Sequence, residues 1–141
     1  MTGRQPRLLV LDNEAVQALG DPTHRRHRHA VALVEVTVGG GRRRAGPAPV
    51  VPTAVRVEAG WDRRVPRAAA INRFQVVDVP LDADSADRAA AVRGALNVSV
   101  ADAHLGATMA TIGRCTVVTS DADDMRRIAG HLVLPVTVVA L

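Results

Sequence analysis

The run Leu8-Leu9-Val10-Leu11-Asp12 places four apolar residues directly before a single carboxylate, and this run indicates the fold class. A short apolar run of this kind is typical of a strand buried on both faces, as strands are in parallel sheets covered by helices. Asn13 is a good helix N-cap and Gly20-Asp21-Pro22 ends helices, so a short helix over Glu14–Leu19 is predicted to follow. This part of the chain therefore predicts a strand followed by a helix.

The alternation of apolar runs and helical segments continues along the rest of the chain. Further strands are predicted at Val50-Val51, Gln75–Val79, Cys115–Thr119 and Val136–Ala140. Further helices are predicted from Thr23 or His24 toward Val38, after a cap at Thr53, and over Arg67–Phe74, Ser85–Leu96, Val100–Ile112 (capped by Ser99) and Asp121–Ala129. Strands that alternate with helices imply a central parallel sheet in a three-layer α/β/α architecture. At 141 residues, the chain is predicted to be a single domain over 1–141.

The composition excludes several classes of enzyme. The chain has one Trp, one Phe and no Tyr, so its core must consist of Val, Leu, Ile and Ala. All 18 basic residues are arginine, which excludes any mechanism that needs a lysine. Phosphoryl-accepting receiver domains and haloacid-dehalogenase phosphatases normally use one, and the Gly-Lys-Ser/Thr of P-loop NTPases is absent as well. The net charge of +4 favours a polyanionic partner.

The apolar and thiol content predicts a protein of the cytoplasm with no membrane span. Cys115 is the only cysteine, so no intrachain disulfide can form, and we expect a buried, inert thiol. No apolar stretch near the N-terminus is long enough for a signal peptide. The apolar run Leu132–Leu141 is too short to cross a bilayer and contains Pro135.

Four acidic residues lie at or soon after predicted strand ends. Asp12 and Asp121 follow strands directly, Asp102 lies in the first turn of a helix, and Glu58 lies one turn into another. Each alone could be a turn, cap or exposed helical residue. Because parallel strands end at one edge of a sheet, all four could face one crevice. Their repulsion would be relieved by a divalent cation, and Mg²⁺ and Mn²⁺ prefer carboxylate oxygens. The sequence therefore favours a metal-dependent enzyme that acts on phosphates.

Four motifs resemble those of the PIN-domain ribonucleases, and closely the VapC-type toxins of prokaryotic toxin–antitoxin pairs. They are Leu9–Asp12, Val50–Thr53 leading to Val57-Glu58, Val100–Thr108, and Val118–Asp124. They occur in the right order and cover essentially the whole chain. The resemblance implies a PIN-like sheet with strand order 3-2-1-4-5, dependence on Mg²⁺ or Mn²⁺, and endoribonuclease activity.

The resemblance also implies the residues of the site. By motif position, the catalytic and metal-binding acids are Asp12, Glu58, Asp102 and Asp121, with Asp124 as an outer metal ligand or helix cap. Thr119 or Ser120 would orient these acids. Glu14 is an extra acid that either joins the metal shell or points to solvent. The expected function is that of a type II toxin, a ribonuclease that hydrolyses RNA phosphodiesters with a metal-activated water.

Arginines are the predicted substrate-binding residues. Those that could bind RNA phosphates are Arg25, Arg26, Arg28, Arg42, Arg43 and Arg44. His104 lies two residues after Asp102, so it faces another side of the helix, and we expect a packing or surface role for it. The expected partners, from the resemblance, are RNA, a VapB-type antitoxin and a second copy of the chain in a homodimer.

One alternative remains open. A degenerate PIN domain could act as a non-catalytic module that binds RNA or protein. The presence of all four acids argues against this alternative.

Overall fold

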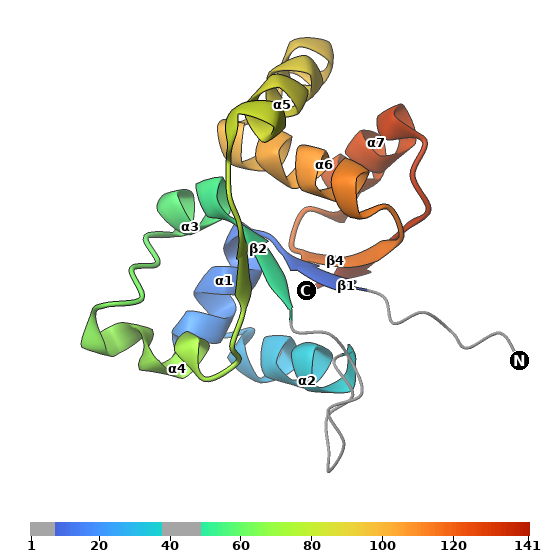
Figure 1. Cartoon of the computed structure of the whole chain (residues 1–141). Coiled ribbons are helices and arrows are strands. Elements are labelled where there is room, and N and C mark those ends of the chain that lie inside the picture. Colours follow the sequence, from blue (N-terminus) through green and yellow to red (C-terminus); the bar gives the residue numbers. More distant parts are fainter. Residues whose placement is uncertain (1–7, 38–48) are drawn as a thin grey trace, which may run out of the picture.

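The computed structural model describes residues 8–37 and 49–141 (Figure 1). Arg42, Arg43 and Arg44, and the predicted helix end at Val38, lie outside the described residues.

Within the described residues, five parallel strands form the central sheet. They are β1 (Leu8–Leu11), β2 (Val50–Pro52), β3 (Val77–Val79), β4 (Cys115–Thr119) and β5 (Val136–Ala140). Their order is β3-β2-β1-β4-β5, which confirms the predicted 3-2-1-4-5 order. In the central pair, Leu8 is aligned with Cys115 and Leu11 with Val118. Asp12 and Thr119 therefore lie side by side where β1 and β4 end.

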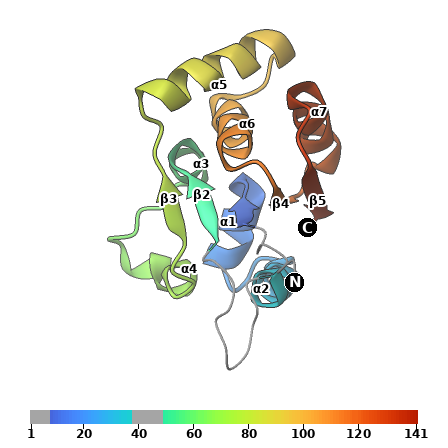
Figure 2. The same ribbon diagram turned by 45° about the vertical axis from the view of Figure 1, so that its right-hand side comes forward.

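Helices cover both faces of the sheet, which confirms the three-layer α/β/α architecture. They are α1 (Asn13–Gly20), α2 (His27–Thr37), α3 (Thr53–Ala59), the 3-10 turn η1 (Pro66–Ala68), α4 (Ala69–Asn72), α5 (Ala83–Leu96), α6 (Val100–Ile112) and α7 (Ala122–Leu132). Helices α1, α2 and α4 lie on one face, and α6 and α7 lie on the other, with α5 packed outside α6 (Figures 1 and 2). Helix α3 contacts both α1 and α6.

The core is mostly Val, Leu, Ile and Ala, as the composition predicts, but it also contains Trp61, Met109, Met125 and Cys115. Leu105 and Met109 of α6 are fully buried. Cys115 is also buried, and burial raises the pKa of its thiol to about 11, as expected for an inert cysteine. Within the described residues, no helix combines the length and apolar character that a membrane span needs.

Helix α6 and the two long strands have the predicted bounds, but several helix starts were predicted wrongly. Asp12, rather than Asn13, is the N-cap of α1. Pro52 precedes α3, so Thr53 is its first residue and not its cap. Asp82 caps α5 by accepting from the backbone N–H of Ser85 at 2.8 Å, so this helix begins before Ser85.

Four further segments differ from their predicted lengths. Helix α2 begins at His27, because the Asp21 carboxylate holds Thr23 in a turn through bonds of 2.9 and 2.7 Å. The predicted helix Arg67–Phe74 is only η1 and α4, and α7 continues through Gly130 to Leu132. Strand β3 starts two residues late, because Gln75 has a φ of 54°, outside the strand region.

Gly106→Ala should destabilise the protein, because α6 packs closely at this point. A Cβ at position 106 would lie 3.0 Å from Cγ2 of Ile128 and 3.3 Å from Cγ1 of Val92. Overpacking costs about 1–3 kcal/mol, whereas alanine gains only about 1 kcal/mol of helix propensity over glycine. The control is Gly94→Ala in α5, where a Cβ meets nothing within 4 Å and should stabilise the helix. Urea denaturation of both variants checks this, and equal gains in stability would contradict it.

Candidate active site

Asp12 lies at the edge of the sheet where the strands end. We call this edge the acidic edge, because the charges of Asp12, Glu58, Asp121 and Asp124 all act on Asp102 there. Asp12 follows β1 and is only 7% exposed. Its Oδ1 accepts a hydrogen bond from the backbone N–H of Ala15 at 2.8 Å. The Thr119 hydroxyl and the Ser120 backbone also favour the charged form, yet burial outweighs them and raises the pKa of Asp12 above its ordinary value. The fold therefore holds a carboxylate in a fixed orientation where burial opposes its charge.

Thr119 connects the ends of the two central strands. It is fully buried, and its Oγ1 accepts from the backbone N–H of Asp121 at 2.9 Å. Its side chain also acts on the Asp12 carboxylate. The position of Thr119 fits the orienting role that the resemblance implies, whereas Ser120 is exposed and offers its backbone to Asp12.

Asp102 is affected by the charges of acids from separate chain segments. It is half-buried in the first turn of α6, after the N-cap Ser99. Burial is the main cause that raises the pKa of Asp102 to about 6, and the charges of other acids add to the effect. Those acids are, in decreasing order of effect, Glu58, Asp12, Asp124 and Asp121. Five carboxylates therefore share one electrostatic environment.

Glu58 reaches this edge from α3. Its side chain is exposed, and its Oε1 accepts from the Asn13 amide at 3.4 Å. This contact brings the second turn of α3 next to the residue that follows Asp12. It also explains why an acid one turn inside its helix still acts on Asp102.

Asp121 and Asp124 form a pair at the start of α7. Asp121 is the N-cap of the helix, and its Oδ1 accepts from the backbone N–H of Asp124 at 3.3 Å. The neighbouring Asp121 carboxylate raises the pKa of Asp124 above its ordinary value. The Arg127 guanidinium lies 3.7 Å from Asp124. Asp124 is therefore not the helix cap, and its carboxylate is within reach of the site.

The chemistry of these donors fits a hard divalent cation. All five groups are carboxylates, the ligand type that Mg²⁺ and Mn²⁺ prefer. Within residues 8–37 and 49–141, however, no three His, Cys, Asp or Glu side chains converge closely enough to hold an ion. Repulsion between carboxylates gives a physical reason, because they approach one another only when a positive charge lies between them. Binding a cation would therefore require side-chain movement, which the exposed Glu58 and Asp121 permit.

Glu14 has a partner outside the acidic edge, so it does not simply point to solvent. The His24 Nε2 lies 3.0 Å from Glu14 Oε1. The other ring nitrogen of His24 accepts from the backbone N–H of Arg26 at 3.1 Å. The pair thus fastens the loop after α1 to the first turn of that helix. The sequence did not predict this role, because Glu14 lies in a helix and His24 lies ten residues later in an irregular loop.

Two of the predicted substrate-binding arginines, Arg25 and Arg26, lie in the loop between α1 and α2, and Arg28 lies at the start of α2. Arg26 Nη1 donates to the Leu141 carbonyl at 2.7 Å. The strand before Leu141 ends beside β4, since Thr119 pairs with Ala140, so Arg26 lies at the acidic edge. Arg25 and Arg28 are exposed nearby in the sequence.

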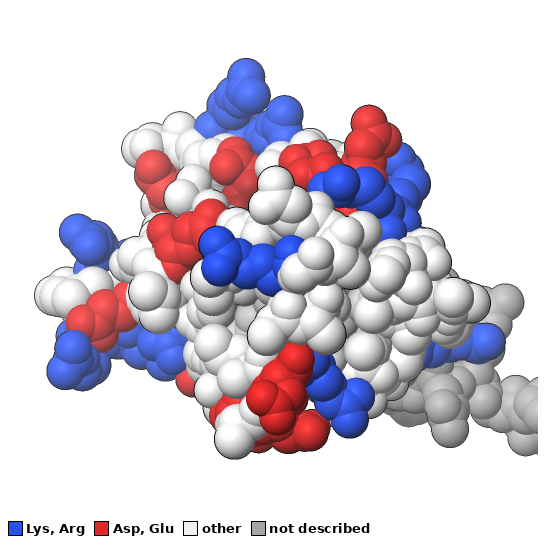
Figure 3. All heavy atoms as spheres, turned by 90° about the horizontal axis from the view of Figure 1, so that it is seen from above, with Lys and Arg blue, Asp and Glu red and all other residues white. Residues whose placement is uncertain are grey.

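The face above α5, α6 and α7 carries a mixture of charges. Figure 3 shows acidic and basic groups interspersed among uncharged residues on this face. This face therefore lacks the continuous basic surface that would bind a nucleic-acid backbone.

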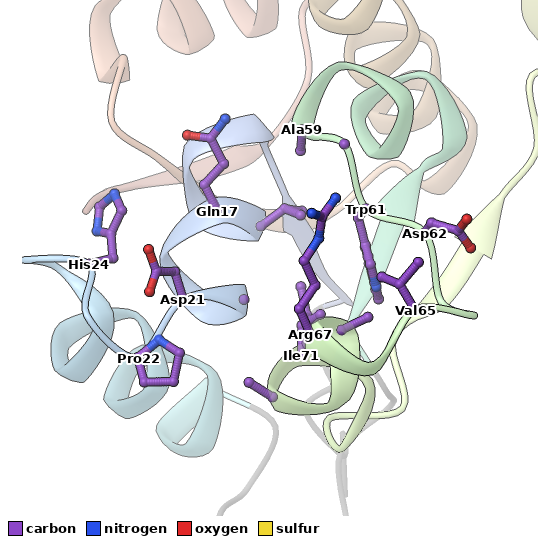
Figure 4. A pocket seen from close by; sticks show the side chains of 15 residues that line it. Gln17, Asp21, Pro22, His24, Ala59, Trp61, Asp62, Val65, Arg67 and Ile71 are labelled. Carbon is purple, nitrogen blue, oxygen red and sulfur yellow. The ribbon is translucent and has the colours of Figure 1, made fainter.

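A separate cavity of about 660 Å³ lies between α1 and α4 (Figure 4). Val16, Trp61 and Ile71 give it a largely apolar lining, and Arg67 extends along it. None of the five acids of the edge lines this cavity. It is therefore distinct from the candidate active site.

Asp102→Asn should raise the free energy of unfolding of the metal-free protein at pH 7. The folded-state pKa of about 6 exceeds the ordinary value of 3.8, so wild-type stability falls as the pH rises from about 4 to 6. The asparagine avoids this loss, which we expect to be about 1–3 kcal/mol after allowance for partial exposure. A first-turn carboxylate gains only about 0.3–1 kcal/mol from the helix dipole.

Urea denaturation in a chelator at pH 7 and pH 4 checks this prediction. The difference between Asp102→Asn and the wild type should shrink strongly at pH 4. Asp87→Asn, an exposed change in α5, is the control and should stay within about 0.5 kcal/mol of the wild type. A variant that is less stable than the wild type at pH 7 would contradict the proposed repulsion.

Comparison with known protein families agrees with the fold. The model of the PIN domain family matches residues 10–131 of the chain. No curated protein matches the chain with significant similarity. The matched region begins in β1 and ends in α7, so it contains all five acids of the edge. The chain therefore belongs to the PIN domain family.

Proposed function

We propose that this protein is a Mg²⁺- or Mn²⁺-dependent endoribonuclease, the toxin of a type II toxin–antitoxin pair. Its family has a nuclease-type fold, and PIN domains are typically metal-dependent nucleases. The observation that carries the proposal is the environment of Asp102, whose pKa is raised first by burial and further by the charges of four other carboxylates. Acids from the starts of α1, α6 and α7 and from α3 that act on one another are expected where a cation binds.

The residues of the edge would divide the work. Asp12 is fixed by hydrogen bonds and burial, so it would be the most rigid ligand. Asp102 and Asp121 would complete the inner set, and Asp124 would act from outside through Asp121. Glu58 is exposed and accepts a long hydrogen bond of 3.4 Å from Asn13, so it would orient the attacking water or a second ion. A bound divalent cation would lower the pKa of water and offset charge on the phosphate.

Recognition of RNA would depend on arginines rather than on stacking of bases. The only Trp, Trp61, is 7% exposed and lies beneath two guanidinium groups, at 5.1 Å from Arg56 and 4.3 Å from Arg63. The only Phe, Phe74, lies beneath Arg73 at 4.6 Å. A stacking platform for single strands needs exposed aromatic rings. The shape of a folded RNA and its phosphates are therefore the features that this surface would bind.

The same repulsion supports the proposed partner. A VapB-type antitoxin that inserted an arginine among the carboxylates would neutralise the edge and exclude RNA from it. A homodimer is part of the same proposal. The alternative of a non-catalytic binding module is not favoured, because the full set of acids is present and brought together.

Asp12→Asn should abolish Mn²⁺-dependent cleavage of RNA while the fold stays intact. Asparagine caps helices about as well as aspartate, so α1 keeps its cap. Changes around a metal ligand alone cost about 10–100-fold in affinity or activity, and loss of a ligand should cost more. Cleavage of total RNA with Mn²⁺ measures the effect, and circular dichroism checks the fold.

The matched control is Asp123→Asn. The Asp123 side chain is fully exposed and paired with Arg126 at 3.4 Å, two residues from Asp121. Its activity should stay near that of the wild type. Cleavage by the wild type in a chelator, or by Asp12→Asn in Mn²⁺, would rule out the proposed mechanism.

The double change Arg25→Ala and Arg28→Ala should reduce the salt dependence of RNA binding. Each phosphate contact contributes about 0.7–0.9 to the slope of log affinity against log salt concentration, so the slope should fall by about 1.5. Binding is measured in the inactive Asp12→Asn background. Arg114→Ala is the control, because Arg114 is exposed just before β4 begins, at the opposite edge of the sheet. An unchanged slope in the double variant would show that these arginines do not contact RNA.

A further inference from the structure

The N-terminus of α3 lacks a cap from its own chain segment. The first backbone N–H groups of a helix have no partner within the helix. Pro52 occupies the N-cap position and, within the described residues, makes no side-chain cap bond. The hydroxyl of Thr53 accepts from the backbone N–H of Leu81 at 3.0 Å, so it is used elsewhere. The N–H of Ala54 must therefore find an acceptor in another element.

His104 of α6 supplies that acceptor. The backbone N–H of Ala54 donates to His104 Nδ1 at 3.3 Å. Because an N–H donates to it, Nδ1 carries a lone pair and the ring proton is on Nε2. The imidazole is fully buried. Its Nε2 has no hydrogen-bond partner within the described part of the chain. A buried polar ring with this arrangement is retained at a cost, which indicates that the bond to α3 matters.

The bond joins the two helices that carry Glu58 and Asp102. Asp102 precedes His104 by two residues in the first turns of α6. Glu58 follows Ala54 by four residues, so the two lie on the same side of α3. Helices α3 and α6 pack directly against each other (Figures 1 and 2). The His104 contact therefore helps to fix the position and rotation of α3 relative to α6, and with them the direction of the Glu58 side chain.

Among the described residues, Glu58 has one side-chain hydrogen bond at the acidic edge. Its carboxylate is exposed and makes a 3.4 Å bond to Asn13. Of the four charges that raise the pKa of Asp102, that of Glu58 nevertheless has the largest effect. Repulsion between Glu58 and Asp102 would push α3 outward if its N-terminus were released.

We propose that His104 is a positioning residue for the acidic site, which caps α3 through Nδ1 and thereby sets Glu58 beside Asp102. This inference rests on the proposed function, because it assigns His104 a role in placing the groups that would hold the metal. His104 does not touch the metal or the RNA.

Two substitutions separate the acceptor from the volume of the ring. His104→Asn places an amide oxygen near the position of Nδ1 and keeps the cap. His104→Leu fills the site without an acceptor. Calorimetric titration with Mn²⁺ alone should show about 10–100-fold weaker binding for His104→Leu, the usual effect of removing a group that orients ligands. His104→Asn should bind Mn²⁺ within about threefold of the wild type, since its cap is retained.

Coupling to Glu58 distinguishes positioning from a general loss of structure. If His104 acts through Glu58, adding His104→Leu to Glu58→Gln should leave the Mn²⁺ affinity of Glu58→Gln unchanged. Equal effects of His104→Leu in both backgrounds, or wild-type affinity in His104→Leu, would overturn the inference. A wild type that binds no Mn²⁺ would instead overturn the proposed function, and this inference with it.

A measurement on the wild type keeps the inference testable if His104→Leu does not fold. Long-range ¹H–¹⁵N NMR spectra report which ring nitrogen carries the proton. A proton on Nε2 is expected. A proton on Nδ1 would overturn the inference, because the Ala54 N–H could not then donate to that atom.

Discussion

Repulsion among carboxylates at the carboxyl edge of the sheet is the constraint from which the surrounding structure follows. Parallel strands β1 and β4 end side by side, so Asp12 and the start of α7 are brought together by the topology. Helix α6 adds Asp102 and α3 adds Glu58. Each carboxylate makes the next one harder to ionise, and burial strengthens the effect. An edge of this kind is stable only where other interactions offset the repulsion.

The fold offsets part of this repulsion with hydrogen bonds that also build the helices. Asp12 and Asp121 are the N-caps of α1 and α7, so each carboxylate accepts from backbone N–H groups at the positive end of a helix. Thr119 adds its hydroxyl between them. Asp102 lies inside the first turn of α6 rather than at its cap, and burial together with the remaining repulsion raises its pKa to about 6. Asp12 and Asp121 thus stabilise helices, whereas a bound cation would favour the charged form of Asp102.

The sequence predicts much of the fold, because short strands and helix ends depend mainly on residues that are close together in the chain. The strand Cys115–Thr119 and the helix Val100–Ile112 have their predicted bounds. The strand order came from family resemblance alone, since composition and periodicity do not determine which strands are neighbours. Gly130 was predicted to end α7, but the helix continues to Leu132 and is capped by Val133 in the left-handed region.

The candidate site was predicted as a set of acids but not as a set of contacts. Motif position identified the residues, whereas their partners depend on tertiary structure. The bond of Asn13 to Glu58 spans 45 residues, and that of Ala54 to His104 spans 50. No local pattern encodes such pairs. The offset of two residues from Asp102 predicted that His104 lies on another side of α6. It could not show that His104 accepts a hydrogen bond from the first turn of α3.

The central claim is that these carboxylates come together around a divalent cation. Anomalous diffraction from crystals soaked in Mn²⁺ tests it most directly. The account predicts a Mn²⁺ peak between the carboxylates of Asp12, Asp102 and Asp121, which would move closer together than in the metal-free protein. Absence of a peak at this edge, at Mn²⁺ concentrations that support RNA cleavage, would contradict the account.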